Sequence, residues 1–166
     1  NLADKEIRDS LPEIEGQLCL VGAPCYEARI PPLVRTTIRQ LQGKKIPTVA
    51  IVLYGNRTIG IALKQLVGLL TAAKFNVYAT GTFIGEHSYT SETLSIAPGR
   101  PDAADLKIAD QFGAELFRAG LNQPKLSPDQ IHGKIQFLFK LLPEGFLGSF
   151  ASPGELDISK CTQCNL

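Results

Sequence analysis

The chain has 166 residues, of which 44% are hydrophobic, and a formal net charge of +1. This composition is typical of a globular domain with a buried core, and it lacks the basic excess that nucleic-acid binding requires. No apolar run reaches the roughly 20 residues of a membrane-spanning helix, and no charged start leads into a signal-peptide pattern. We therefore expect no nucleic-acid partner and no membrane span. The contexts of the four cysteines favour a reducing, cytoplasmic location over a secreted disulfide framework.

Strand and helix patterns alternate through the first two thirds of the sequence. Continuous apolar runs predict three strands, at 17–26, 46–55 and 76–83. Apolar residues at helical spacing predict three helices, at 31–43, 61–75 and 102–120. This alternation predicts an α/β fold with a doubly wound parallel sheet that is covered on both faces. Ligands of such sheets bind beyond the carboxyl ends of the strands, so the loops that follow the strands are the candidate sites.

The domain organisation follows from a change of composition after Gly120. We assign residues 1–120 to the α/β domain and residues 121–158, which are rich in Pro, Gly and Ser, to a partly packed connector. Within the connector, apolar residues at 131–142 match a helical face that can dock on the domain. Residues 159–166 form a separate short segment that carries two cysteines.

The loop "GAPCYEARIPP" (22–32) follows the first predicted strand. The ring of Tyr26 can lie against a planar ligand, and the peptide groups of the loop can bond the edge of a heterocycle. The alternative is a rigid connection in which Tyr26 packs on its own scaffold. The loop "LYGNRTIG" (53–60) follows the second strand, where Gly55 permits a close backbone approach and Arg57 can pair with an anion. Helix capping by Asn56 or Thr58 is the structural alternative for this loop.

The third loop, "FIGEHSYTSETLSIAPGRPD" (83–102), is long for a compact α/β domain, and such loops are usually functional or disordered. His87 lies near its start and is a possible proton donor near physiological pH, although a single histidine is more often structural. Pro101-Asp102 indicates the start of a helix, with Asp102 or Asp105 at its positive end. The loop thus offers one candidate catalytic group and one structural junction.

The final "CTQC" places Cys161 and Cys164 at a metal-ligand spacing. A structural zinc ion and a cubane iron–sulfur cluster each need four ligands, so two thiolates are half a site. In a bacterial ferredoxin run, the third cysteine would come directly after Leu166. Half a zinc ribbon, a thioredoxin-type dithiol and chance are the alternatives. Together with the absence of any Met, this spacing leads us to expect a fragment that is truncated at both ends.

The loop motifs, "IAPGRPDAADLKIADQFG" and the terminal "CTQC" together resemble the flavodoxin-like domain of proteins that fuse a flavodoxin fold to a C-terminal 4Fe-4S ferredoxin segment. The resemblance covers residues 17–118. It implies a parallel sheet of order 2-1-3-4-5 with FMN at the strand ends. It also implies that the first strand, the first helix and the second strand of the family, with the phosphate loop, are missing here. The residues that match the flavin loops are Pro24, Cys25, Tyr26, Glu27, Ala28, Arg29, Tyr54, Gly55, Asn56 and Arg57.

The resemblance implies an electron-transfer protein in which FMN and a 4Fe-4S cluster pass electrons between redox partner proteins. Its cluster ligands include Cys161 and Cys164, and its remaining ligands lie beyond residue 166. Two other functions stay open. One is a cysteine-dependent hydrolase or transferase with Cys25 as nucleophile, His87 as base and Glu86 or Glu27 as the orienting group. The other is an interaction module that keeps the flavodoxin fold without its cofactor.

Overall fold

The computed structural model describes residues 5–11, 13–87 and 90–134. Its elements in chain order are α1 (Lys5–Asp9), β1 (Cys19–Pro24), α2 (Pro32–Gln40), β2 (Pro47–Tyr54), α3 (Ala62–Ala72), β3 (Asn76–Ile84), α4 (Ala103–Ala119) and the 3-10 helix η1 (Pro128–Gln130). The three strands and three long helices confirm the predicted alternation, with ends that differ by a few residues. The short helix α1 and η1 were not predicted from the sequence.

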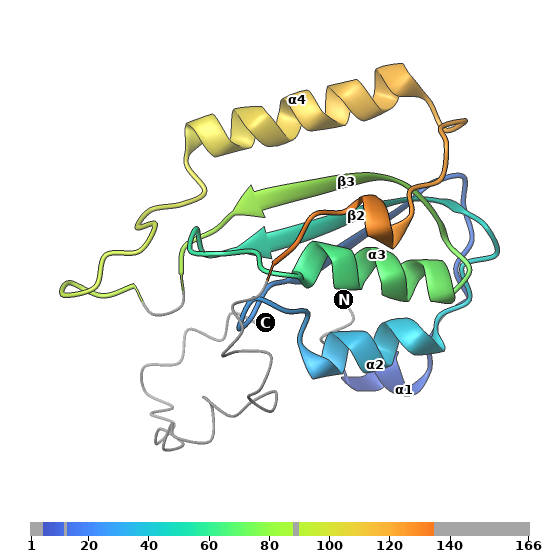
Figure 1. Cartoon of the computed structure of the whole chain (residues 1–166), viewed down its shortest axis with the longest axis horizontal. Coiled ribbons are helices and arrows are strands. Elements are labelled where there is room, and N and C mark those ends of the chain that lie inside the picture. The colour runs from blue at the N-terminus through green and yellow to red at the C-terminus, as the bar shows by residue number, and fades with distance from the viewer. Residues whose placement is uncertain (1–4, 12, 88–89, 135–166) are drawn as a thin grey trace.

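The strands form one parallel sheet of order β1-β2-β3 (Figure 1). Cys19 lies opposite Thr48, and Pro47 lies opposite Asn76, with an irregularity between Thr48 and Val49. Each strand is therefore hydrogen-bonded to the next strand in the sequence, through a crossover that contains a helix. This topology confirms the predicted α/β class and the parallel direction of the strands. It also brings the three loops that follow the strands to one edge of the sheet.

Helices cover the two faces of the sheet unequally. Helices α2 and α3 lie on one face and α4 lies on the other (Figure 1). On the first face, Leu66 and Leu70 of α3 are fully buried against the strands. Burying an aliphatic side chain of this size contributes about 1.5–3 kcal/mol. The core of the domain therefore lies between the sheet and the α2–α3 layer.

The second face is less completely covered in the part of the chain that the structure describes. Phe112 of α4 packs on Phe83 of β3 with ring centroids 5.5 Å apart. Away from this contact, Leu20 of β1 is 61% exposed and Leu53 of β2 is 48% exposed. Phe117 of α4 is 89% exposed. Among the described residues, Leu20 and Leu53 therefore leave an apolar surface exposed on the β1 side of this face.

The connector that follows α4 returns to the α3 side of the sheet (Figure 1). The Leu126 amide donates to the Val77 carbonyl at 2.8 Å, and Ile131 packs against the core. Residues 131–134 are not helical, so the predicted helical face is wrong for this part, and residues 135–142 lie outside the described residues. No helix in the described ranges has the length and apolar character needed to cross a bilayer.

Candidate functional site

The first loop forms a tight turn at the end of β1. Tyr26 and Arg29 exchange two backbone hydrogen bonds of 2.9 Å, which closes a two-residue hairpin. Its central residues, Glu27 and Ala28, have φ angles of +50° and +61°. Type I′ turns need positive φ at both positions, which Gly or Asn usually supplies. The turn is thus held in a conformation that its own sequence does not favour, and the Tyr26 side chain is 62% exposed.

Hydrogen bonds to backbone carbonyl groups join the first loop to the second. The Ile61 amide donates to the Ala28 carbonyl at 2.9 Å. The Cys25 thiol lies 3.6 Å from the Thr58 carbonyl oxygen and 3.5 Å from that of Ile59, as a donor to both. These contacts offset the cost of the positive φ angles because they fix the turn from outside. The loops after β1 and β2 therefore behave as one unit.

Cys25 serves this junction as a hydrogen-bond donor. Burial raises the pKa of its thiol, while hydrogen bonds to the backbone of Ala28 and Arg29 oppose the rise. A nucleophilic cysteine needs a lowered pKa, because the thiolate is the reactive form. The surroundings of Cys25 therefore favour a structural role over the nucleophilic role that the hydrolase alternative requires.

The third loop meets the second at Gly55. The Gly85 amide donates to the Tyr54 carbonyl at 3.0 Å, and His87 lies directly against Gly55. A Cβ atom at position 55 would lie 2.5 Å from the His87 Cδ2 atom. Asn56 follows with a φ of +53°, and its side chain is exposed. The structure thus brings Gly55 of the second loop into contact with His87.

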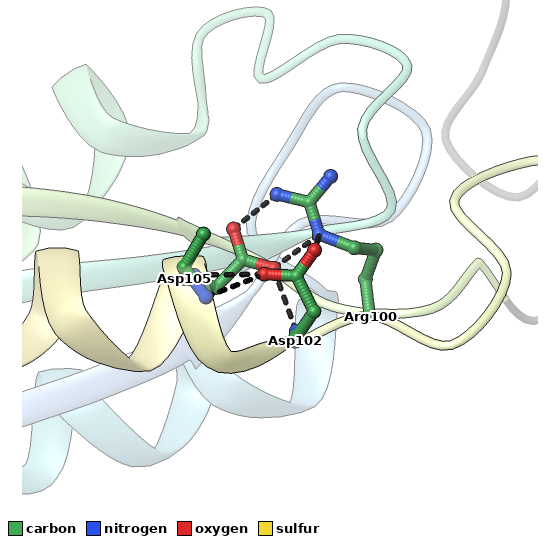
Figure 2. Close-up of polar contacts among 4 residues, drawn as sticks. Arg100, Asp102 and Asp105 are labelled. Atoms are coloured by element: carbon green, nitrogen blue, oxygen red, sulfur yellow. Dashed lines mark hydrogen bonds and ion pairs between the residues drawn. The ribbon is translucent and has the colours of Figure 1, made fainter.

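An ion-pair cluster anchors the far end of the third loop to α4 (Figure 2). The Arg100 guanidinium binds both carboxylate oxygens of Asp105, and the Glu86 amide donates to the Arg100 carbonyl at 2.8 Å. Asp102 caps α4 by accepting from the Ala104 amide at 2.8 Å and the Asp105 amide at 3.0 Å. The predicted helix start at Asp102 is confirmed. Arg100 consequently links the start of the third loop to the first turn of α4.

This cluster makes stability depend on pH. Hydrogen bonding from Arg100, opposed by desolvation, lowers the pKa of Asp105 to about 2. A carboxylate with a lowered pKa stabilises the fold fully above its unfolded pKa of about 3.9 and loses this effect as the pH falls toward 2. We expect Asp105→Asn to flatten the dependence of unfolding free energy on pH between these values, measured by urea denaturation. Arg100→Gln should reduce the same slope, and an unchanged slope in Asp105→Asn would contradict the assignment.

Cys161 and Cys164 lie outside the described residues. The part of the chain that the structure describes holds no group of three or more His, Cys, Asp or Glu side chains that could bind a metal ion. Since that part excludes both cysteines, the cluster remains a prediction from their spacing. The remaining predicted site residues, from Pro24 to Arg29 and from Tyr54 to Arg57, all lie at the carboxyl edge of the sheet.

Three residues of this edge were not predicted from the sequence. Gln65 of α3 accepts a hydrogen bond from the Ile30 amide at 3.0 Å through Oε1, which fixes the end of the first loop. Gly60 lies in contact with Ala28 and has a φ of +51°. Arg100 holds Asp105 as described above. Of these three residues, only Arg100 could have been identified from the sequence, because it directly precedes the Pro-Asp helix start in "GRPDAAD".

No protein-family model matches the chain, and no curated protein matches it. The fold and the loops define it as an α/β protein with a parallel sheet and a candidate ligand site at the carboxyl edge of that sheet. Three loops that are far apart in the sequence form this site, and backbone hydrogen bonds join them to one another or to the neighbouring strand.

Proposed function

We propose that the chain is the FMN-binding, flavodoxin-like part of an electron-transfer protein that also carries a C-terminal 4Fe-4S segment. The observation that carries this proposal is the convergence of the three loops at the carboxyl edge of a parallel sheet. The Ile61 amide bonds the Ala28 carbonyl, the Gly85 amide bonds the Tyr54 carbonyl, and His87 contacts Gly55. Parallel sheets of this class bind flat cofactors at that edge.

The residues of the site fit a flavin. Tyr26 presents a ring that is 62% exposed, which does not agree with the alternative that this ring packs on its own scaffold. Exposed aromatic rings beside backbone amides bind planar heterocycles by stacking and hydrogen bonding. Tyr54 ends β2 directly before Gly55, which contacts His87, and Arg57 is exposed on the second loop. In this role Tyr26 and Tyr54 would flank the ring, and His87 would exchange a proton with it.

The sheet supports the finer proposal of a flavodoxin-like fold. The order β1-β2-β3 agrees with the last three strands of the order 2-1-3-4-5. Because the Cys25 amide bonds the Leu53 carbonyl at 2.8 Å, the alternate residues Leu20 and Gly22 direct their backbone groups away from β2. Leu20 and Leu53 also expose apolar side chains on one face. A further strand beside β1 would pair these backbone groups.

The bound flavin would supply redox chemistry that connects two-electron and one-electron carriers. Cys161 and Cys164 would provide two ligands of an adjoining cluster, and this part of the proposal rests on their spacing alone. The protein would then be a cytoplasmic electron carrier that exchanges electrons with redox partner proteins. Within this role the chain's own loops would bind the ring and set its hydrogen bonding.

The proposal is tested with the full-length polypeptide, purified without oxygen after reconstitution with FMN, iron and sulfide. We expect a yellow-brown protein that retains flavin and iron through gel filtration. Cys161→Ser should lower the iron content and leave the flavin content unchanged, since Cys161 is not among the residues predicted to contact the flavin. A folded, colourless and iron-free product would contradict the proposal and favour an interaction module without a cofactor.

A further inference from the structure

Three exposed lysines, Lys45, Lys74 and Lys125, lie at the amino edge of the sheet, where β2 and β3 begin. This edge is opposite the loops of the candidate flavin site (Figure 1). The Lys45 amide donates to the Lys74 carbonyl at 2.7 Å, which joins the turn before β2 to the turn before β3. Lys125 directly precedes Leu126, whose amide bonds the Val77 carbonyl of β3. Backbone hydrogen bonds thus hold the three segments that carry these residues, the edge lysines, at one end of the sheet.

The charges of these three segments have one sign. Residues 41–48, 72–78 and 121–128 contain four lysines and no acidic residue. The fourth lysine, Lys44, pairs with Glu13. Within the described ranges, no acidic side chain forms an ion pair with an edge lysine. Exposed like charges without acidic neighbours in their own segments produce a positive potential over this edge.

Lysines occupy backbone positions at this edge that favour other residue types. The Ile46 amide donates to the Gly43 carbonyl at 2.8 Å and closes a tight turn. Its central residues, Lys44 and Lys45, have φ angles of +47° and +62°. Asn-Gly is the usual sequence of such a type I′ turn. Lys74 follows α3 with a φ of +68°, where a helix usually carries glycine. The backbone conformation therefore does not explain why lysine is found at these positions.

We propose that the edge lysines bind an acidic surface of a partner protein. Complementary charges steer two such proteins together and fix their relative orientation. A nucleic acid fits this edge less well, because the net charge of the chain is only +1. An anionic membrane also fits less well, because the basic segments that bind one carry about four to eight Lys or Arg residues.

A partner at this edge leaves the candidate flavin site open. Strand β2 (Pro47–Tyr54) separates the two edges by about 23 Å, at a rise of about 3.3 Å per residue. None of the edge lysines belongs to the three loops of the flavin site. The proposed docking surface is therefore independent of a bound flavin.

The test measures binding of a fluorescein-labelled oligoglutamate peptide to the 166-residue chain by fluorescence anisotropy at low ionic strength. We expect saturable binding that weakens with added salt, because salt screens exposed charges. Lys45→Gln, Lys74→Gln and Lys125→Gln should each weaken binding about two- to fivefold, as expected for the loss of one exposed charge pair. Lys107→Gln removes the same charge from an exposed position on α4, so this matched control should bind like the wild type.

Two substitutions of Lys74 separate a role in docking from a role in stability. The structural alternative is that its ammonium group stabilises the carbonyl end of α3. If the lysine serves docking, Lys74→Gly should weaken peptide binding as much as Lys74→Gln does. Lys74→Gly should also raise the urea concentration at the unfolding midpoint, because glycine favours a φ of +68°. A lower midpoint together with unchanged peptide binding would overturn the proposal.

Other outcomes also decide against this docking surface. No peptide binding, or equal weakening by Lys107→Gln and by the edge-lysine variants, would overturn the proposal. Tighter binding of a DNA duplex or of phosphatidylserine vesicles, lost in the same variants, would overturn the assignment to an acidic protein. Flavin-free and flavin-loaded preparations should bind the peptide equally, so failure here is distinct from failure of the flavin proposal.

Discussion

Gly60→Ala is expected to destabilise the domain by roughly 2–4 kcal/mol. Gly60 has a φ of +51°, a conformation that costs an alanine about 1–2 kcal/mol. The new Cβ atom would also lie 2.9 Å from the Ala28 Cα atom and would clash with the Ala28 carbonyl. Relieving this clash moves the first loop away from the second. Urea denaturation monitored by circular dichroism measures the loss.

The control for this prediction is Gly113→Ala. Gly113 lies inside α4, its φ is not positive, and a Cβ atom there meets open space. Because alanine favours a helix interior over glycine, this variant should be more stable by about 0.5–1 kcal/mol. If Gly60→Ala unfolds at the same urea concentration as the wild type, then the contact between the first and second loops does not support the fold as described.

Gly55→Ala is expected to displace His87 and to destabilise the domain by about 1–3 kcal/mol through overpacking. An added Cβ atom would lie 2.5 Å from the His87 Cδ2 atom and 2.9 Å from its Cα atom. Since a backbone atom is involved, rotation of the imidazole cannot remove the clash. The position of the His87 ring can be followed by the chemical shifts of its carbon-bound protons.

Gly85→Ala is the matched control within the same group of loops. A Cβ atom at Gly85 meets nothing within 4 Å, and its φ is not positive. We expect wild-type stability and unchanged His87 signals in this variant. Equal effects of the two substitutions would show that the contact between Gly55 and His87 does not determine the loop arrangement.

The sequence predicted the sheet and its helices because their signals are local. The apolar run at 46–55 and the helical spacing at 61–75 each report burial of a single element, and both elements formed. The position of the candidate site followed from a general rule, since loops after parallel strands meet at one edge. Pro24 to Arg29, Tyr54 to Arg57 and His87 accordingly lie at that edge.

The contacts within the site could not be predicted, because they join segments that are distant in the sequence. In the sequence Gln65 looks like an ordinary helix residue. Only the structure shows that its Oε1 accepts a hydrogen bond from the Ile30 amide. Gly60 looks like a loop glycine, and only its contact with Ala28 shows why a side chain is excluded there. The turn at Glu27 and Ala28 also lacks the usual glycine or asparagine, so no residue of the turn indicates its positive φ angles.

The most direct test of the central claim is a titration of FMN with the full-length polypeptide, followed by quenching of flavin fluorescence. We expect saturable binding with one flavin per chain. Gly55→Ala should weaken it about tenfold, which corresponds to about 1.4 kcal/mol, and Gly85→Ala should leave it unchanged. A folded protein that does not quench FMN, or one in which Gly55→Ala binds as tightly as the wild type, would contradict a flavin site formed by these three loops.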